Sequence, residues 1–202
     1  MDFKFNFGAA DTPAEPAEKG PTDLSTPEGF IVPRRVTVDW QADMPDEETL
    51  EALYEEMEFK GREPILRCRP PNSESLDGPL AAAIEGSDLV PGVYEGGFKV
   101  WECSMDLVNH LVDNNVEFKD LKVIELGCGH GLPGIHALQQ GAVVDFQDYN
   151  TEVLMEVTVP NIRVNCPNPP TPPKLFIGDW GQLPAAIARA EEGGDAEEEE
   201  LG

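Results

Sequence analysis

The sequence has little positive charge: 14 Lys and Arg stand against 39 Asp and Glu, which gives a formal net charge of −25 over 202 residues. A surface of this sign repels phosphate backbones, so we expect no direct nucleic-acid binding and favour basic proteins as partners. The acids concentrate in residues 39–58 and 191–200. An equally good interpretation is that they only keep the chain in solution.

Cysteine and histidine are also scarce, with four and three copies, and no C-x-x-C pair occurs. This excludes the usual zinc motifs and a disulfide framework, so we expect no metal site and a reducing compartment, either cytoplasmic or nuclear or both. No stretch approaches 18 consecutive apolar residues, and residues 1–20 have no basic start followed by an apolar run. We therefore expect neither a membrane span nor a secretory signal.

Proline and glycine, 19 of each, concentrate in residues 8–33, 61–97 and 160–173, which favours loops there. The opening MDFKFNF alternates phenylalanine with polar residues, so it is interpreted as a strand added to a sheet edge, a docking peptide or, preferably, a disordered terminus. We predict four segments: a polar, disordered arm over 1–45, an acidic helix and linker over 46–86, the main domain over 87–190, and an acidic tail over 191–202.

Within the linker segment, Asp46–Lys60 is predicted to be helical, capped by Asp46, and a short apolar helix is possible at Pro79–Glu85. From Ser104 onward helical and strand patterns alternate. The expected strands are Leu121–Leu126, Val143–Gln147 and Lys174–Ile177; the expected helices are Ser104–Asn114, Pro133–Gln140, Thr151–Val159 (ended by Pro160) and Leu183–Glu192. This alternation predicts an α/β fold with a parallel, doubly wound sheet in the strand order 3-2-1.

A glycine-rich loop, Glu125-Leu-Gly-Cys-Gly-His-Gly131, follows the first of these strands. Glycines at this spacing allow a sharp turn and a close approach of the backbone to a ligand. Asp148 ends the second strand and Asp179, with Trp180 beside it, follows the third. Because ligands bind at the carboxyl ends of parallel strands, three acids at three successive strand ends indicate a binding site.

Each acid also has a purely structural interpretation: Glu125 could cap loop amides, Asp148 could cap the following helix, and Asp179 could be a turn residue. No Gly-Lys-Ser/Thr follows the loop, and Leu132 stands where a dinucleotide fingerprint has a small residue. An acidic loop suits a cation better than a pyrophosphate. The residues therefore favour an adenosine with a positive centre and no phosphate, which is S-adenosylmethionine.

Five segments recur together and in order: the run from Ser87 to Cys103 with its PGVYEGGFKVWEC, ELGCG at 125–129, FQDYN at 146–150, EVTVPN at 156–161 and GDW at 178–180. On these segments the chain closely resembles the histidine protein methyltransferase family, of the seven-β-strand class of S-adenosylmethionine enzymes. The resemblance covers roughly residues 87–184. It implies a Rossmann-like class I methyltransferase sheet.

The resemblance implies N-methylation of a histidine side chain in a protein substrate, expected to be a large-subunit ribosomal protein, with S-adenosylmethionine as cofactor. It implies roles in cofactor binding for Trp101, Glu102 and Cys103 as a cover, Glu125, Gly127 and Gly129 in the loop, Asp148, Tyr149 and Asn150 at the ribose, and Asp179 and Trp180 at the adenine. No catalytic base is identified. His130 is interpreted as a tolerated substitution in the loop, where family members usually have a small residue.

The fourth strand of the family pattern is not found after Ala190, where the acidic tail begins. We therefore expect an incomplete sheet, truncated after the third strand, whose first strand lies at an open edge, and we expect the 202-residue chain to be inactive by itself. Two alternatives from other classes remain: a non-catalytic protein that docks basic partners through its acidic segments, and, more remotely, a dinucleotide-dependent oxidoreductase.

Overall fold

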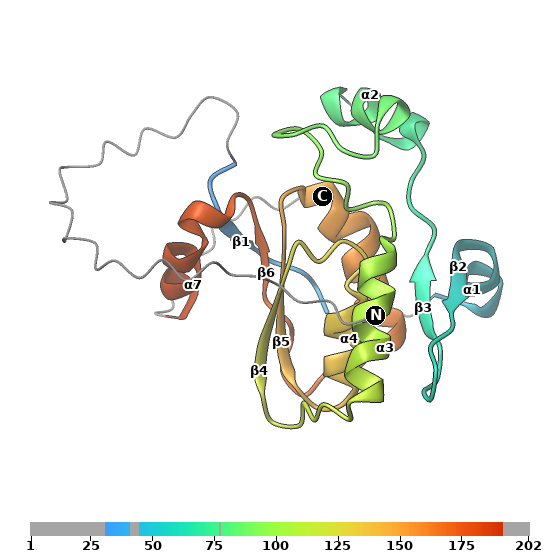
Figure 1. Cartoon of the computed structure of the whole chain (residues 1–202). Helices are drawn as coiled ribbons and strands as arrows, with labels where there is room; N and C mark the ends of the chain where they lie inside the picture. Colours follow the sequence, from blue (N-terminus) through green and yellow to red (C-terminus); the bar gives the residue numbers. More distant parts are fainter. Residues whose placement is uncertain (1–30, 41–44, 77, 192–202) are drawn as a thin grey trace, which may run out of the picture.

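The computed structural model describes residues 31–40, 45–76 and 78–191 (Figure 1). In these residues the main sheet has the strand order β1-β6-β5-β4. Its parallel strands are β4 (Lys122–Leu126), β5 (Val143–Asp148) and β6 (Leu175–Ile177). Since β4, β5 and β6 are the three predicted strands, the α/β class and the 3-2-1 order are confirmed.

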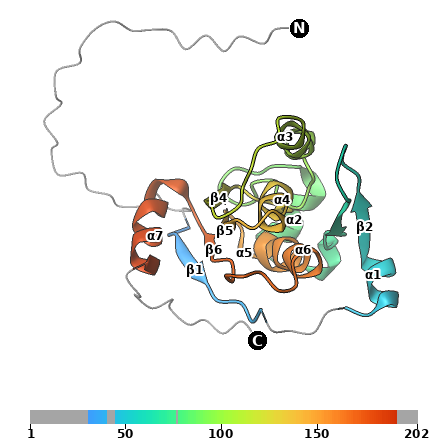
Figure 2. The same cartoon turned by 90° about the horizontal axis from the view of Figure 1, so that it is seen from below.

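Helices cover both faces of this sheet (Figure 2). α4 (Leu132–Gln139) joins β4 to β5, and a longer helical segment that ends in α6 (Val159–Asn165) joins β5 to β6. Both lie on one face, and α7 (Leu183–Glu191) lies on the other. α3 (Glu102–Asp113) packs outside α4 and buries only Val108 completely.

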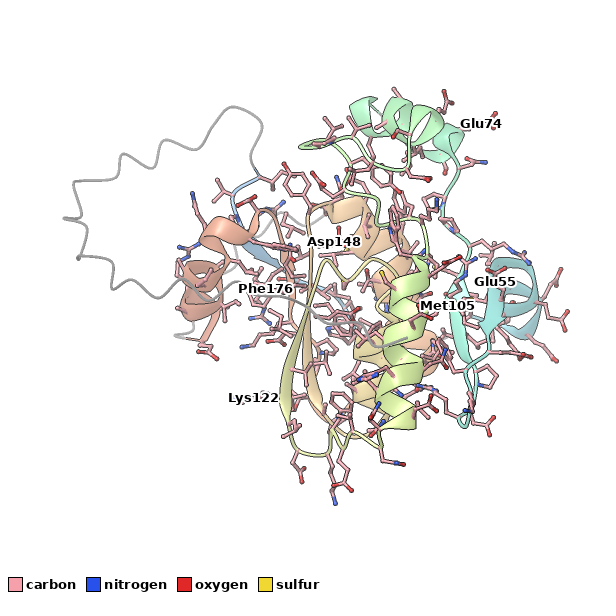
Figure 3. The ribbon with its side chains drawn as sticks, viewed as in Figure 1. Glu55, Glu74, Met105, Lys122, Asp148 and Phe176 are labelled. Atoms are coloured by element: carbon pink, nitrogen blue, oxygen red, sulfur yellow. The ribbon has the colours of Figure 1, made fainter. Side chains whose placement is uncertain are left out.

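The main core lies between the sheet and the helices α4 and α6. Val144 and Phe146 alternate along β5 and are fully buried, as are Leu175 and Ile177 on β6. Phe176 points to the other face, where it packs with residues of α7 (Figure 3). The two faces of β6 are therefore apolar, as expected of a strand covered on both sides.

The helix after β5 runs past Pro160, so the prediction that it ends there is wrong. α5 (Thr151–Val153) continues through a π-helical turn, Leu154–Thr158, into α6. Proline lacks an N–H and would leave the carbonyl of Glu156, four residues earlier, without its usual donor. The Cys68 thiol lies 3.4 Å from that carbonyl oxygen and donates to it, and burial raises the pKa of this thiol to about 12.

Part of the predicted disordered arm is ordered. β1 (Arg34–Val36) pairs antiparallel with β6, with Arg34 opposite Ile177 and Val36 opposite Leu175. Ile31, Val36 and Val38 pack against the main core. This apolar contact stabilises a segment that polar composition alone indicated as disordered, and the prediction is wrong for residues 31–40. MDFKFNF and the acidic tail from residue 192 lie outside the described residues.

The segment of residues 46–86 contains more structure than predicted. α1 (Glu47–Leu53) has the predicted cap, with the Thr49 amide donating to Asp46 Oδ1 at 2.8 Å. It ends at Leu53, because β2 (Tyr54–Met57) pairs with β3 (Ile65–Cys68) in an antiparallel hairpin. A 3₁₀ turn at Ser73–Ser75 and α2 (Gly78–Gly86) follow, and α2 confirms the short helix expected at Pro79–Glu85.

Two asparagines of α6 attach the hairpin to the sheet domain. Asn161 Oδ1 accepts from the Cys68 amide at 2.6 Å, and Asn165 Oδ1 accepts from the Leu66 amide at 2.9 Å. Asn165 Nδ2 also donates to the Leu66 carbonyl at 2.6 Å. The free edge of β3 is thus satisfied by amide side chains one helical turn apart.

Across the described ranges 31–40, 45–76 and 78–191, no helix has the length and apolar character needed to cross a membrane. The same ranges contain no group of three or more His, Cys, Asp or Glu side chains that could hold a metal ion.

Candidate functional site

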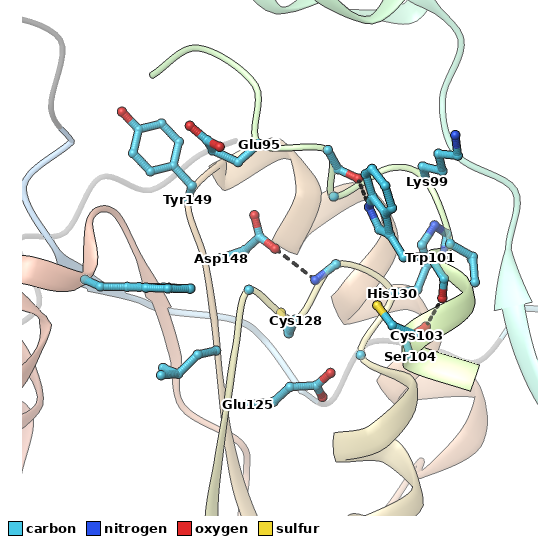
Figure 4. Close-up of a pocket in the computed structure, with 18 of the residues that line it drawn as sticks. Glu95, Lys99, Trp101, Cys103, Ser104, Glu125, Cys128, His130, Asp148 and Tyr149 are labelled. Carbon is cyan, nitrogen blue, oxygen red and sulfur yellow. Dashed lines mark hydrogen bonds between the residues drawn. The ribbon is translucent and has the colours of Figure 1, made fainter. Parts of the chain in front are cut away.

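A cavity of about 1020 Å³ opens at the carboxyl ends of β4, β5 and β6 (Figure 4). One wall is the glycine-rich loop after β4, and the opposite wall is the segment from Pro91 to Ser104. Asp148, Tyr149, Asp179 and Trp180 close the end formed by β5 and β6. The cavity therefore lies where an open parallel sheet binds its ligand, and its size accommodates a nucleoside-sized molecule.

The glycine loop requires glycine at its turning points. Gly127, Gly129 and Gly131 have φ angles of 59°, 49° and 70°, which side-chain-bearing residues rarely adopt. A Cβ on Gly129 would also lie 3.1 Å from the Gly97 carbonyl oxygen, which belongs to the opposite wall. The two walls of the cavity therefore meet backbone to backbone at Gly129 and Gly97.

Asp148 lies at the centre of the site and is 4% exposed. Its Oδ2 accepts from the Gly129 amide at 2.8 Å (Figure 4), and its Oδ1 accepts from the Asn150 amide at 3.3 Å. Burial raises the pKa of this carboxyl group, and these backbone donors oppose the rise. Asp148 therefore holds the loop in place as well as lining the cavity, and each carboxylate oxygen has lone pairs left for a ligand hydroxyl.

Glu125 lines the cavity but is committed to the protein: its Oε2 accepts from the Gly134 amide in the first turn of α4, at 2.7 Å. Burial raises the pKa of this carboxyl group to about 8. At pH 7 the group is therefore mostly neutral. This corrects the electrostatic part of the sequence argument, in which a charged Glu125 selects a cation; the capping interpretation describes its geometry better.

Asp179 and Trp180 follow β6 and both line the cavity. Asp179 Oδ1 accepts from the Gly181 amide at 2.7 Å and caps the 3₁₀ turn Trp180–Gln182, while its own amide donates to the Ile31 carbonyl. Trp180 is 61% exposed, yet its Nε1 donates to Gln147 Oε1 at 2.8 Å. A broad aromatic face at the cavity wall with one fixed edge is a suitable platform for a planar base.

The opposite wall is held by several side-chain bonds. Trp101 lines the cavity and donates from Nε1 to the Gly96 carbonyl at 3.0 Å. The Lys99 ammonium lies 5.3 Å from the centre of the Trp101 ring and forms an ion pair with Asp88. Cys103 and Ser104 extend this wall at the start of α3. Of the three residues expected to cover the ligand, Trp101 and Cys103 therefore line the cavity.

Two predicted ligand residues do not line the cavity. Glu102 is exposed in the first turn of α3. Asn150 uses its amide for the opposite wall, since Nδ2 donates to the Val93 carbonyl at 2.8 Å and Oδ1 accepts from the Glu95 amide at 3.2 Å. Tyr149 lines the cavity and its hydroxyl donates to the Gly92 carbonyl at 3.3 Å. The Asn150 side chain thus holds the opposite wall through a contact with Glu95, 55 residues away in sequence.

His130 is buried in the glycine loop at the cavity, and both of its ring nitrogens have partners. Its Nε2 lies 2.9 Å from the Phe98 carbonyl oxygen, and Asn161 Nδ2 lies 3.4 Å from its Nδ1. Burial lowers the pKa of the ring to about 4, so the ring is neutral near pH 7. With one nitrogen donating and the other accepting, the imidazole connects the glycine loop to the opposite wall and to α6.

Two polar residues at the site were not singled out from the sequence: Glu95, which lines the cavity, and Gln147, which lies behind it. Glu95 is exposed at the cavity, and its Oε1 accepts from the Gly92 amide at 2.8 Å. Gln147 is completely buried behind the cavity and bonds to Trp180 and to the glycine loop. Glu95 stands in a Gly-rich segment whose course is set by tertiary contacts. Gln147 precedes Asp148, so strand alternation directs it to the other face of the sheet.

Residues 92–189 match a protein family described as lysine methyltransferase. Three relatives illustrate the similarity. A histidine protein methyltransferase 1 homolog of Dictyostelium discoideum is 50% identical over 97 residues, which are 48% of this chain and 31% of the relative. A protein of the same name from Rattus norvegicus is 55% identical over 82 residues, 40% of this chain and 23% of the relative.

The histidine protein methyltransferase 1 of Schizosaccharomyces pombe is 44% identical over 86 residues, 39% of this chain and 25% of that protein. The chain thus spans less than a third of the length of each of these relatives. The matched stretch contains the glycine loop, both walls of the cavity and all three parallel strands.

Proposed function

Because residues 92–189 match this methyltransferase family, we propose that the protein binds S-adenosylmethionine in the cavity and methylates a histidine side chain of a basic protein, expected to be ribosomal. The histidine specificity is taken from the names of the relatives, and the basic character of the substrate from the net charge of −25. The adenosyl group would lie between Asp148 and Trp180, with the glycine loop beneath it.

The charges at the cavity carry this proposal. Among the described residues that line it, Lys99 is the one lysine or arginine, and it is paired with Asp88. Asp148, Asp179 and Glu95 line the same space. A pyrophosphate would meet these carboxylates without a free cation to neutralise it. A nucleoside that carries a sulfonium and no phosphate suits the site, and this argues against the dinucleotide alternative.

The residues present fit such a cofactor. Asp148 retains acceptor capacity for ribose hydroxyls, the exposed Trp180 indole offers a wall for adenine, and a side chain on Gly129 would reach Gly97 and crowd the space between them. When bound, S-adenosylmethionine supplies an electrophilic methyl group on sulfur. The chain's part is to orient the ligand and to exclude water from it, since alignment is the main catalytic requirement of an in-line displacement.

The nucleophile must be a neutral imidazole nitrogen of the substrate. Its lone pair would attack the methyl carbon as the carbon–sulfur bond breaks and the thioether S-adenosylhomocysteine leaves, and the proton on the ring would pass to solvent or to a base. His130 does not serve as this base. Both of its ring nitrogens are engaged, with Phe98 and Asn161, and its pKa of about 4 makes it a weak proton acceptor at neutral pH. We assign no catalytic base within the described residues 78–191.

Isothermal titration of the 202-residue chain with S-adenosylhomocysteine tests the cofactor assignment. We expect saturable binding that NAD neither reproduces nor displaces. The variant Asp148→Ala should bind far more weakly, whereas the variant Asp46→Ala, which removes the N-cap of α1 away from the cavity, should bind like the wild type. Binding of NAD at the same site, or a heat of S-adenosylhomocysteine binding that Asp148→Ala leaves unchanged, would contradict the proposal.

One observation favours a second candidate, a protein that docks basic partners without catalysis. The segment from α1 to the residue after β2 exposes Glu47, Glu48, Glu51, Glu56 and Glu58. Such a surface predicts capture of basic proteins that weakens as salt rises. Capture that survives Asp148→Ala, together with no S-adenosylhomocysteine binding by the wild type, would favour this candidate. Capture that is insensitive to salt would exclude it.

A further inference from the structure

Gln147 is the buried polar residue with the most consequential contacts near the cavity, although it does not line it. The side chain is 0% exposed and lies one position before the end of β5. Its Oε1 accepts from the Gly127 amide at 3.1 Å and from Trp180 Nε1 at 2.8 Å. Its Nε2 donates to the Gly178 carbonyl at 2.8 Å.

These three partners come from the ends of the strands on either side of β5. Gly127 directly follows β4, and Gly178 and Trp180 follow β6. One side chain therefore connects the carboxyl ends of all three parallel strands. The amide suits this place, because two of the three partners are donors and the third is an acceptor. A carboxylate could not donate to Gly178, and an aliphatic side chain would leave all three groups without this partner.

The contact with Trp180 matters most for a ligand. An indole that is 61% exposed would rotate among several rotamers if only its ring packed against the protein. The bond from Nε1 fixes one edge of the ring, and the ring lies against the loop: a Cβ built on Gly127 would be 3.7 Å from Trp180 Cζ2. Gln147 thereby holds both the aromatic wall and the first glycine of the loop.

We propose that Gln147 is a positioning residue that orients the Trp180 indole and the Gly127 amide for an adenosyl ligand before the ligand binds. The inference rests on the proposed function, since it names the ligand by the adenosyl group. Gln147 contributes by preorganisation, because a wall that is already fixed loses less conformational entropy on binding.

The variant Gln147→Leu removes all three hydrogen bonds at similar volume. In ¹⁵N-labelled ligand-free protein, the Trp180 indole N–H signal, assigned with Trp180→Phe, should shift and exchange with solvent faster. Affinities for S-adenosylhomocysteine and for adenosine, measured by calorimetry, should fall by the same factor of about ten, the size expected for loss of one net hydrogen bond. S-adenosylhomocysteine and adenosine share the adenosyl group, so an equal loss of affinity for both is expected if Gln147 positions the wall that contacts this group.

Two further variants separate positioning from general destabilisation. Gln147→Glu keeps an acceptor for Trp180 and should retain the indole signal. Asp145→Ala is the matched control: Asp145 lies on the same strand and face, accepts from the Lys174 amide at 3.1 Å, and does not line the cavity. It should leave the Trp180 signal and both affinities unchanged, even where it lowers the melting temperature.

Trp180→Phe is the test that remains if Gln147→Leu does not fold, because Trp180 is exposed. It keeps an aromatic ring without the anchoring N–H, so both affinities should fall about as far as expected for Gln147→Leu. The inference is overturned if Trp180→Phe binds like the wild type, if Gln147→Leu keeps the wild-type indole signal, or if Asp145→Ala weakens binding equally. Failure of the wild type to bind S-adenosylhomocysteine would instead overturn the proposed function, whatever the indole signal shows.

Discussion

The cavity region and the hairpin region, which consists of α1 and the β2–β3 hairpin, use their polar side chains in different ways. Around the cavity, buried polar residues such as Gln147, Asp148 and Asn161 each bond to the backbone of another element. In the hairpin region most acids are exposed, and Glu55 forms an ion pair with Arg67. Buried bonds specify one geometry, whereas exposed charges tolerate change. The cavity should therefore be sensitive to substitutions that the hairpin accepts.

The family match follows the same division. It begins at residue 92, so it includes the cavity and leaves out the hairpin and α2. Asn161 and Asn165 join the two regions. Substitutions in each region therefore test how far a change in one region affects the other.

The largest effect is expected from Asp148→Ala. It removes the acceptor of the Gly129 and Asn150 amides inside a buried site, so affinity for S-adenosylhomocysteine should fall more than about 100-fold. Asp46→Ala removes a comparable amide acceptor from the hairpin region and should cost about 1 kcal/mol of stability without a change in affinity. Calorimetry and urea unfolding give both numbers. If Asp148→Ala and Asp46→Ala lost equal affinity, the proposed difference in sensitivity between the cavity and the hairpin region would be wrong.

Gly134→Ala should destabilise the protein by about 1–3 kcal/mol through overpacking. Its new Cβ would lie 2.3 Å from Phe146 Cε1 and 2.5 Å from Glu125 Oε2, both held in the core of the cavity region. Gly86→Ala at the end of α2 is the matched control, because nothing lies within 4 Å of its Cβ position. Thermal unfolding should show a lower melting temperature only for Gly134→Ala; a comparable drop for Gly86→Ala would refute the packing argument.

The two asparagines should separate attachment of the hairpin from support of the cavity. Asn165→Ala frees the Leu66 backbone groups and should cost about 1 kcal/mol of stability with no change in S-adenosylhomocysteine affinity. Asn161→Ala should also weaken binding a few-fold, because Asn161 Nδ2 donates to the His130 carbonyl of the glycine loop at 3.0 Å. Thermal unfolding and calorimetry on both variants test this. Identical affinities would show that the loop does not depend on α6.

The smallest effect concerns pH. Burial raises the pKa of Glu125 from its ordinary value of 4.5 to about 8 in the folded chain, so the folded state favours the protonated form. Its contribution to stability is complete below about pH 4.5 and is lost as the pH rises through 8. Between pH 6 and pH 8 the wild type should lose on the order of 1 kcal/mol of unfolding free energy, and Glu125→Gln should not show this loss. Urea unfolding of both proteins at both pH values measures the difference. A wild type that is equally stable relative to this variant at both pH values would contradict the raised pKa.

Local patterns predicted the framework of the cavity well. The spacing of Gly127 and Gly129, the strand that precedes them and the acid at the end of β5 are features of neighbouring residues, and the structure confirms their places. The hairpin was predicted poorly. β2 was interpreted as part of a helix, because Tyr54 and Met57 also fit helical spacing, and the pairing with β3 that decides between the two is not local.

The hydrogen-bond partners and charge states of side chains in the site could not be predicted from the sequence either. Asn150 was expected at the ribose, and the structure shows that its amide bonds to the opposite wall; Glu125 was assigned a charge that its burial largely removes at pH 7. Residue type and position along a strand are the same for either role. The role depends on which donors the fold brings within bonding distance and on how much water remains.

By itself, the sequence determined the parallel α/β order, the glycine turns and the placing of acids at three strand ends, since hydrophobic periodicity and glycine spacing act over a few residues. Only the tertiary structure decided that β1 joins the sheet, that the helix continues past Pro160 beside Cys68, and that Gln147 connects three strand ends. The physical reason is that each of these depends on partners tens of residues apart, whose hydrogen bonds form only once the core has packed.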